Sequence, residues 1–125
     1  MDIETLHTKV VEAIFTVGHE LCPGYLEVVY RNALLYELRL RGIKCEAEVP
    51  IPVKYKGVTV GEYRCDILVD DSLIMELKAT ESLTKNNEIQ LVNYLVATGI
   101  DQGLLVNFGT TPPTIKRKRR IFTRT

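Results

Sequence analysis

Hydrophobic residues in the first third of the chain recur with the spacing of two amphipathic helices. They form one apolar face over residues 3–20 and another over residues 25–41. Cys22-Pro23-Gly24 interrupts the pattern between them, and Gly42 is suited to end the second helix. Each helix therefore needs a core that covers its apolar face. The residues expected to point inward from the second helix are Leu26, Val29, Tyr30, Ala33, Leu34 and Leu38.

The pattern then changes to that of β-strands, which are expected at 43–55, 58–69 and 72–79. Pro50 and Pro52 cannot donate to a strand ladder, so the first of these strands should be an edge or irregular strand. Lys56-Gly57 is typical of a hairpin turn. If the next loop has three residues, Asp66 lies opposite Glu76, whereas a two-residue loop would set Asp66 opposite Met75.

The last third of the chain returns to mixed structure. A polar loop is expected at 80–86, a helix at 87–98, a short apolar strand at 104–108, a turn at 109–113 and a charged strand at 114–122. This order predicts an α/β or α+β fold with a mixed sheet. With 125 residues, the chain is expected to form a single domain, 1–125.

Two charged residues interrupt an otherwise apolar strand. Glu76 and Lys78 are two positions apart in Leu73-Ile74-Met75-Glu76-Leu77-Lys78-Ala79, so their side chains point to the same face. A charge inside such a strand costs several kcal/mol unless it is paired or holds a metal. A plain Glu–Lys pair on an exposed strand would explain the tripeptide alone, but Asp66 precedes it across a turn. Together these residues favour a functional site.

Two carboxylates on adjacent strands can hold a hard divalent cation such as Mg²⁺. Asp66 and Glu76 would supply carboxylate oxygens, and the backbone carbonyl of Leu77 could supply a third ligand. Lys78 would then orient or deprotonate a metal-bound water, or stabilise charge that develops on phosphorus. Hydrolysis of a phosphodiester bond is the reaction that best suits this set.

Other candidate residues lie on the predicted helices. Glu27 falls in the first turn of the second helix, where its charge also favours the helix dipole, and Tyr30 lies on roughly the same face or in the core. Gln90 and Tyr94 are four residues apart on the third helix and share a face.

In this order of motifs the chain resembles the GxxExxY protein family, a branch of the PD-(D/E)xK nuclease superfamily. The resemblance covers nearly the whole sequence. The matching stretches are Gly24–Tyr30, Tyr63–Val69, Met75–Ala79, Gln90–Leu95 and Gly103–Gly109.

The resemblance implies a restriction-endonuclease-like αβββαβ core with a central mixed sheet. It implies a metal site built by Asp66, Glu76 and Lys78, with Mg²⁺ or Mn²⁺ as cofactor, and Glu27 corresponds to the helical glutamate that often completes such a site. Gln90 and Tyr94 match the Q-x-x-x-Y element of RecB-like nucleases, which supports the site and the nucleic acid.

Charge is unevenly distributed along this neutral chain. Residues 1–115 carry a net charge of −6 and residues 116–125 one of +6, from Lys116, Arg117, Lys118, Arg119, Arg120 and Arg124. The basic segment could contact phosphates, or it could be a solvated edge strand whose charges prevent aggregation. No apolar run is long enough to span a bilayer, and Met1-Asp2-Ile3-Glu4 does not open a signal peptide. A cytoplasmic protein without membrane contact is therefore expected.

The leading hypothesis is a Mg²⁺-dependent nuclease that cuts DNA, with DNA favoured over RNA as the nucleic acid partner. The alternative is a non-catalytic nucleic-acid-binding or protein-interaction module on a nuclease fold. A small-molecule enzyme is a weaker alternative, because the sequence holds no glycine-rich phosphate loop or cofactor fingerprint. A chain of this size has little room for a recognition domain, so a homodimer or a partner protein is expected to contribute to substrate choice.

Overall fold

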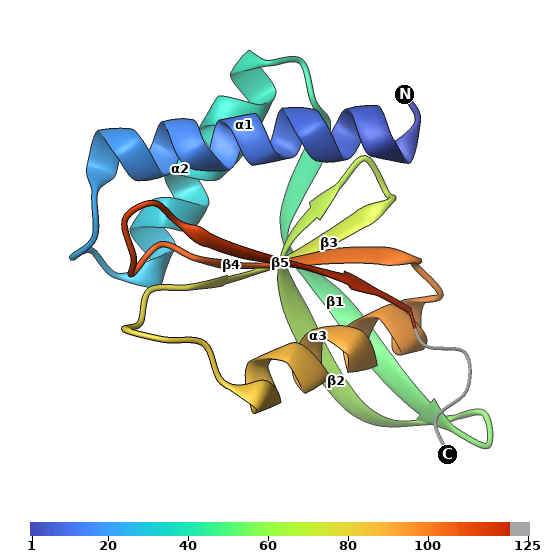
Figure 1. Cartoon of the computed structure of the whole chain (residues 1–125). Helices are drawn as coiled ribbons and strands as arrows, with labels where there is room; N and C mark the ends of the chain where they lie inside the picture. The colour runs from blue at the N-terminus through green and yellow to red at the C-terminus, as the bar shows by residue number, and fades with distance from the viewer. Residues whose placement is uncertain (121–125) are drawn as a thin grey trace.

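The computed structural model describes residues 1–120 and contains three helices and a five-stranded mixed sheet (Figure 1). Strands follow one another across the sheet in chain order, and every neighbouring pair is antiparallel except the parallel pair β3–β4. The predicted α+β class with a mixed sheet is therefore confirmed. The elements are α1 (Ile3–Leu21), α2 (Glu27–Leu40), β1 (Cys45–Tyr55), β2 (Val58–Val69), β3 (Leu73–Lys78), α3 (Lys85–Thr98), β4 (Gln102–Asn107) and β5 (Thr114–Arg119).

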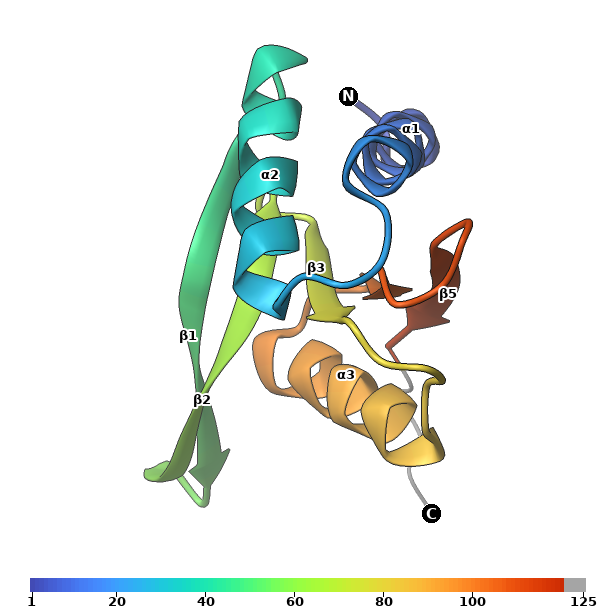
Figure 2. The same cartoon turned by 90° about the vertical axis from the view of Figure 1, so that its left-hand side faces the viewer.

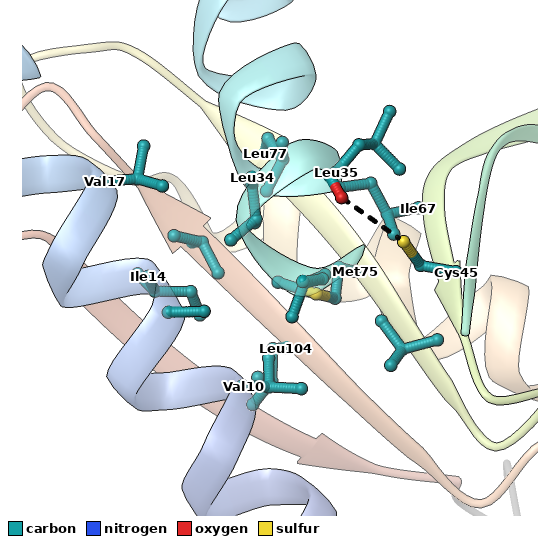
Figure 3. Packing of buried hydrophobic residues seen from close by; sticks show 14 of the residues in the cluster. Val10, Ile14, Val17, Leu34, Leu35, Cys45, Ile67, Met75, Leu77 and Leu104 are labelled. Atoms are coloured by element: carbon teal, nitrogen blue, oxygen red, sulfur yellow. Dashed lines mark hydrogen bonds between the residues drawn. The ribbon is translucent and has the colours of Figure 1, made fainter. Parts of the chain in front are cut away.

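Helices cover both faces of the sheet, with α1 and α2 on one side and α3 on the other (Figures 1 and 2). The larger core lies under α1 and α2, where Val10, Ile14 and Leu34 meet Met75 and Leu104 of the central strands (Figure 3). A smaller core lies under α3 and joins its apolar side chains to β1–β4. The sheet thus separates two apolar layers, and its central strands are buried on both faces.

Local sequence explains where the helices begin and end. Asp2 caps α1 by accepting a hydrogen bond from the Thr5 backbone N–H, and Thr84 caps α3 in a reciprocal capping box with Asn87. Gly42 and Gly99 follow the ends of α2 and α3 with positive φ angles of 74° and 76°. The prediction that Gly42 ends α2 is confirmed, and Gly99 plays the same part after α3.

Helix α2 differs from the prediction at its start and in one part of its buried face. Leu26 has an extended backbone and precedes the helix as its N-cap, and its side chain is 77% exposed. Val29 is also exposed, whereas Leu35, which was not expected to point inward, is buried. The inward prediction for Leu26 and Val29 was wrong, because the face that meets the sheet follows Tyr30, Leu34, Leu35 and Leu38.

Other element bounds agree with the sequence to within a few residues. Helix α3 starts two residues before its expected position because Thr84 provides the cap. Strand β1 lies at the edge of the sheet, as its two prolines predicted, and Lys56-Gly57 forms the hairpin turn with both φ angles positive. The expected strand 114–122 ends at Arg119, and its positions 121 and 122 lie outside the described residues. The expectation of a single domain stays a prediction.

The loop between β2 and β3 has three residues, because Val69 pairs with Leu73. The last recorded pair of this ladder is Ile67 with Met75, and the same register places Asp66 opposite Glu76. The three-residue alternative is thus confirmed, and the two-residue alternative is wrong.

Strand β2 is much longer than its contact with β3. Only Ile67–Val69 pairs with β3, whereas the whole length of β2 pairs with β1. The rest of the β1–β2 hairpin extends past the end of β3 as a twisted two-stranded arm, which lies beside α3 at the lower left of Figure 2. We call residues 49–65 the arm. Asp66 stands where the arm leaves the sheet.

Candidate metal centre and active site

The predicted acidic pair lies where β2 and β3 separate. The backbone N–H of Asp66 donates to Glu76 Oε1 over 3.1 Å, and the backbone N–H of Leu77 donates to Asp66 Oδ2 over 2.7 Å. Side-chain carboxylates therefore satisfy the two amides just beyond the last ladder pair. These bonds use one oxygen of each carboxylate. The structure thus brings Asp66 and Glu76 together.

Burial makes this pair electrostatically unusual. Glu76 is 6% exposed, and its burial, with the neighbouring Asp66 carboxylate, raises its pKa to about 8. Burial also raises the pKa of Asp66, although the bond from the Leu77 N–H and the charge of Lys78 oppose that rise. Two adjacent carboxyl groups in a desolvated position ionise together only with difficulty. A bound cation would remove that difficulty, so the donor set fits a divalent ion.

Glu27 forms the outer wall of the site. It is the first residue of α2, it is exposed, and its charge adds to the rise in the pKa of Glu76. A cavity of about 160 Å³ is lined by Glu27, Val28, Arg31, Asp66 and Leu77. Within residues 1–120, however, no three His, Cys, Asp or Glu side chains converge closely enough to form a ready metal cluster. Asp66 and Glu76 are thus the close donors, and Glu27 faces the same cavity from α2.

Two carboxylates are sufficient for Mg²⁺, which is commonly held by one or two carboxylates together with water and substrate oxygens. The residues present therefore fit the cofactor predicted for this site. Leu77 contributes its N–H to the acidic pair. The role of its carbonyl as a ligand stays a prediction.

Lys78 follows Glu76 on the same face of β3 and is half-buried. Its charge favours the ionised forms of both Asp66 and Glu76. Its backbone is fixed from the neighbouring strand, because the N–H of Phe108 donates to the Lys78 carbonyl over 2.8 Å. This bond fixes the strand position from which the Lys78 ammonium group acts on the acidic pair.

A buried side-chain amide also fixes the backbone at Thr80, two residues after Lys78. Asn107 is 1% exposed, and its Oδ1 accepts hydrogen bonds from the N–H groups of Thr80 and Gly109 at 3.0 and 2.9 Å. Its Nδ2 donates to the Thr80 carbonyl over 2.9 Å. Gly109 packs so closely on Thr80 that a Cβ there would overlap with the Thr80 backbone. We call Asn107, Gly109 and Thr80 the amide clamp; it holds the chain where it leaves β3.

Gln90 and Tyr94 come from α3, on the side of the sheet opposite α2. The Tyr94 ring lies against Tyr63 of the arm, with 5.7 Å between ring centroids. Burial raises the pKa of Tyr94 to about 12, and the Glu76 and Asp66 carboxylates add to the rise. The charges of the acidic pair therefore act on Tyr94, and Gln90 lines the same cavity as Tyr94 and Tyr63.

Tyr30 has a different environment from the other candidates. It is fully buried, its ring stacks on Phe108 at a centroid distance of 4.8 Å, and its hydroxyl donates to the Cys22 carbonyl over 2.5 Å. The same hydroxyl accepts a bond from the Tyr25 N–H at 3.1 Å. Tyr30 thus anchors the loop that leads into Glu27, because its hydroxyl bonds to backbone groups of that loop.

Three residues near the site were not singled out as site residues from the sequence: Arg31, Tyr63 and Asn107. The charge of Arg31 opposes the rise in the pKa of Asp66, and Arg31 forms an ion pair with Glu48 at 3.0 Å. Its position four residues after Glu27, on the same helical face, was the available signal. For Asn107 the available signal was its polar side chain at the end of an otherwise apolar strand. Tyr63 carried no comparable signal.

The basic C-terminal segment forms the other edge of the sheet as strand β5. Lys116 and Lys118 both pair with Glu88 of α3, and Arg117 pairs with Glu4 of α1 at 2.6 Å. Arg120 pairs with Asp101 at 2.7 Å. These contacts support the edge-strand interpretation over a segment that is free to contact phosphates. Arg124 lies outside the described residues.

Comparison with protein-family profiles matches residues 4–120 to the PD-(D/E)XK nuclease superfamily. The chain belongs to this superfamily, and its sheet and helices form the expected restriction-endonuclease-like fold. Nucleases of this class typically use divalent metals and act on nucleic acid. The GxxExxY branch stays a prediction. No curated protein matches the chain.

Among solved structures, the crystal structure of SSO0001 is similar, with a TM-score of 0.57 and 19% sequence identity. The match covers 76% of this chain and 50% of SSO0001, so the chain spans about half the length of that protein. At this identity the likeness concerns the fold alone. No helix of residues 1–120 has the length and apolar character needed to cross a membrane.

Proposed function

We propose that the protein is a nuclease that hydrolyses phosphodiester bonds in DNA with the help of Mg²⁺ or Mn²⁺. The observation that carries this proposal is the hydrogen-bonded pair of Asp66 and Glu76, with Lys78 on the same face of β3. Membership of a nuclease superfamily supports it.

Each residue of the site then has a role. Asp66 and Glu76 would hold the cation, with Glu27 as an additional donor from α2. A bound Mg²⁺ or Mn²⁺ supplies a Lewis acid for a phosphoryl oxygen and lowers the pKa of bound water. Lys78 would orient the attacking water or accept a proton from it, or, in its charged form, stabilise negative charge on the phosphoryl oxygens. Gln90 and Tyr94 hold the substrate strand from the side of α3.

Cleavage of labelled single- and double-stranded DNA tests the proposal. Reactions contain EDTA, Mg²⁺ or Mn²⁺, and the wild type is compared with Lys78→Ala. Lys9→Ala is the matched control, because Lys9 is an exposed lysine of α1. We expect metal-dependent products from the wild type and Lys9→Ala, and none from Lys78→Ala.

Full cleavage by Lys78→Ala would refute the role of Lys78. If the wild type gives no products and binds no metal, the chain is better explained as a non-catalytic binding module. Gel filtration of the active sample tests the accompanying prediction of a homodimer or partner-dependent enzyme. A cytoplasmic location stays a prediction.

A further inference from the structure

A groove lies between the arm and α3, on the side of the sheet opposite α2. Its volume is about 820 Å³, within the range of binding pockets for organic molecules. The arm contributes Val53, Lys54 and Tyr63, and α3 contributes residues that include Asn86, Ile89 and Gln90. The groove exists because β2 continues beyond its last pair with β3, and no strand within residues 1–120 pairs with the arm on that side.

Two tyrosines of the groove connect it to the acidic pair. Tyr94 lines the groove and also lies close enough to Glu76 and Asp66 for both carboxylates to influence its hydroxyl. Tyr63 packs against Tyr94 and is three residues before Asp66 on β2. If a strand were bound with one phosphate at the carboxylates, Tyr63 would be the aromatic ring on β2 available to its neighbouring nucleotides.

The side chains that line the groove are of the types that recognise nucleic acid bases. Among the described residues 1–120, the lining of the groove consists of aromatic rings, side-chain amides and aliphatic groups, and the one charged member is the cation Lys54. Tyr63 is 50% exposed, so much of its ring is open to a ligand. Aromatic faces bind bases of any sequence by stacking, and amides can pair with base edges. The part of the chain that the structure describes contributes no carboxylate to this lining, which suits a polyanion.

We propose that this groove binds unpaired nucleotides of the DNA strand that is cut, with one base stacked on Tyr63. The inference rests on the proposed nuclease function and specifies its substrate. Unpaired nucleotides are required because a duplex keeps its base faces stacked and its pairing edges engaged, so that only an unpaired base can use the ring of Tyr63. Lys54 would contact a phosphate of the same segment.

Binding can be measured separately from cleavage. Fluorescence anisotropy of a labelled oligothymidylate, with EDTA present so that the strand stays intact, compares the wild type with Tyr63→Ala and Tyr63→Phe. Tyr36→Ala is the matched control, because Tyr36 is 66% exposed on α2. We expect Tyr63→Ala to weaken binding about 5- to 150-fold, the effect of losing one base–aromatic stack. Tyr63→Phe keeps the ring and should bind like the wild type.

A second variant tests the position of the phosphate. Lys54→Glu should weaken binding of the single strand and reduce the slope of log affinity against log salt by about 1. A blunt duplex of the same length should bind more weakly than the single strand, and its affinity should not depend on Tyr63. Melting curves of each variant establish that the fold is retained.

The outcomes separate this inference from the proposed function. If Tyr63→Ala and Lys54→Glu both bind oligothymidylate like the wild type, the groove proposal is wrong, whatever the cleavage assay shows. Preferential, Tyr63-independent binding of duplex would also overturn it. If binding depends on Tyr63 but the wild type never cleaves DNA, the groove stands as a nucleic-acid site and the nuclease proposal fails.

Discussion

Glu76 accepts a hydrogen bond from the backbone N–H of Asp66, the residue opposite it across the β2–β3 hairpin. A carboxylate here occupies the place of a ladder carbonyl. The arrangement opens the sheet between the two strands and leaves a second oxygen of the Glu76 carboxylate outside this bond. The same residue therefore ends the strand pairing and provides a donor for a cation.

The raised pKa of Glu76 predicts how stability depends on pH. Its pKa is about 8 in the folded protein and 4.5 ordinarily, so the folded state binds the extra proton between these values. The free energy of unfolding of the metal-free protein should therefore fall as pH rises from 4.5 through about 8. The slope from this group is at most about 1.4 kcal/mol per pH unit.

Glu76→Gln removes this ionisation and keeps an oxygen acceptor for the Asp66 N–H. We expect the variant to be more stable than the metal-free wild type above pH 8 and to have a flatter pH profile. Urea denaturation across this pH range measures both effects. Glu62→Gln, an exposed glutamate of the arm, is the control and should follow the wild type. Parallel profiles for Glu76→Gln and the wild type would contradict the assignment.

Metal binding should stabilise the protein without any substrate. At a free Mn²⁺ concentration of a hundred times the dissociation constant, the stabilisation should be about 2.7 kcal/mol. At a fixed Mn²⁺ concentration the stabilisation should increase with pH, because the metal competes with the proton on Glu76 and its dissociation constant falls. Differential scanning fluorimetry at two pH values measures the shift. Asp66→Asn should lose it, whereas Glu20→Gln, exposed at the end of α1, should retain it; equal shifts in both variants would count against this site.

Asn107 should contribute to both stability and activity through the amide clamp. Asn107→Ala leaves the N–H groups of Thr80 and Gly109 without their acceptor, which should cost about 1–3 kcal/mol for each group that stays buried. Because the clamp follows Lys78, cleavage should fall mainly through kcat while KM changes little. Asn32→Ala, at an exposed position of α2, is the control and should show neither effect.

Gly109 should tolerate no side chain, whereas Gly61 should. A Cβ at Gly109 would overlap with the backbone of Thr80, so Gly109→Ala forces the two segments apart and should destabilise by about 1–3 kcal/mol. A Cβ at Gly61 would meet only a Tyr63 ring carbon at 3.8 Å, an ordinary contact. Chemical denaturation of the two variants side by side measures the difference, and equal stabilities would show that the contact at Gly109 can relax.

The meeting of Asp66 with Glu76 could be predicted from the sequence because it depends on one short loop. Once the loop has three residues, the register follows and period 2 assigns the faces. The hydrogen bonds from backbone N–H groups to these carboxylates could not be predicted from loop length and register. The period-2 rule assumes a continuous ladder, and here the ladder stops one pair earlier.

The neighbours of the pair depend on tertiary geometry that no local pattern contains. Tyr63 comes near Tyr94 because the arm twists past α3, and Arg31 reaches the site because α2 crosses the sheet with Glu27 at its tip. Leu26 and Val29 also show that a local pattern does not determine tertiary position. Their hydrophobicity predicted burial, yet α2 turns a different face to the sheet.

The contacts of the acidic pair and of the amide clamp join residues at different separations along the chain. Asp66 and Glu76 are ten residues apart and meet through a three-residue loop, whereas Asn107 and Thr80 are 27 residues apart and meet only after α3 has crossed over the sheet. The entropy of loop closure rises with length, and contacts between distant residues form late. We therefore expect the acidic pair to assemble early in folding, as part of a local hairpin. Lys78 takes its final backbone position only when β4 joins the sheet, so we expect the site to be completed at a later step than the one that pairs Asp66 with Glu76.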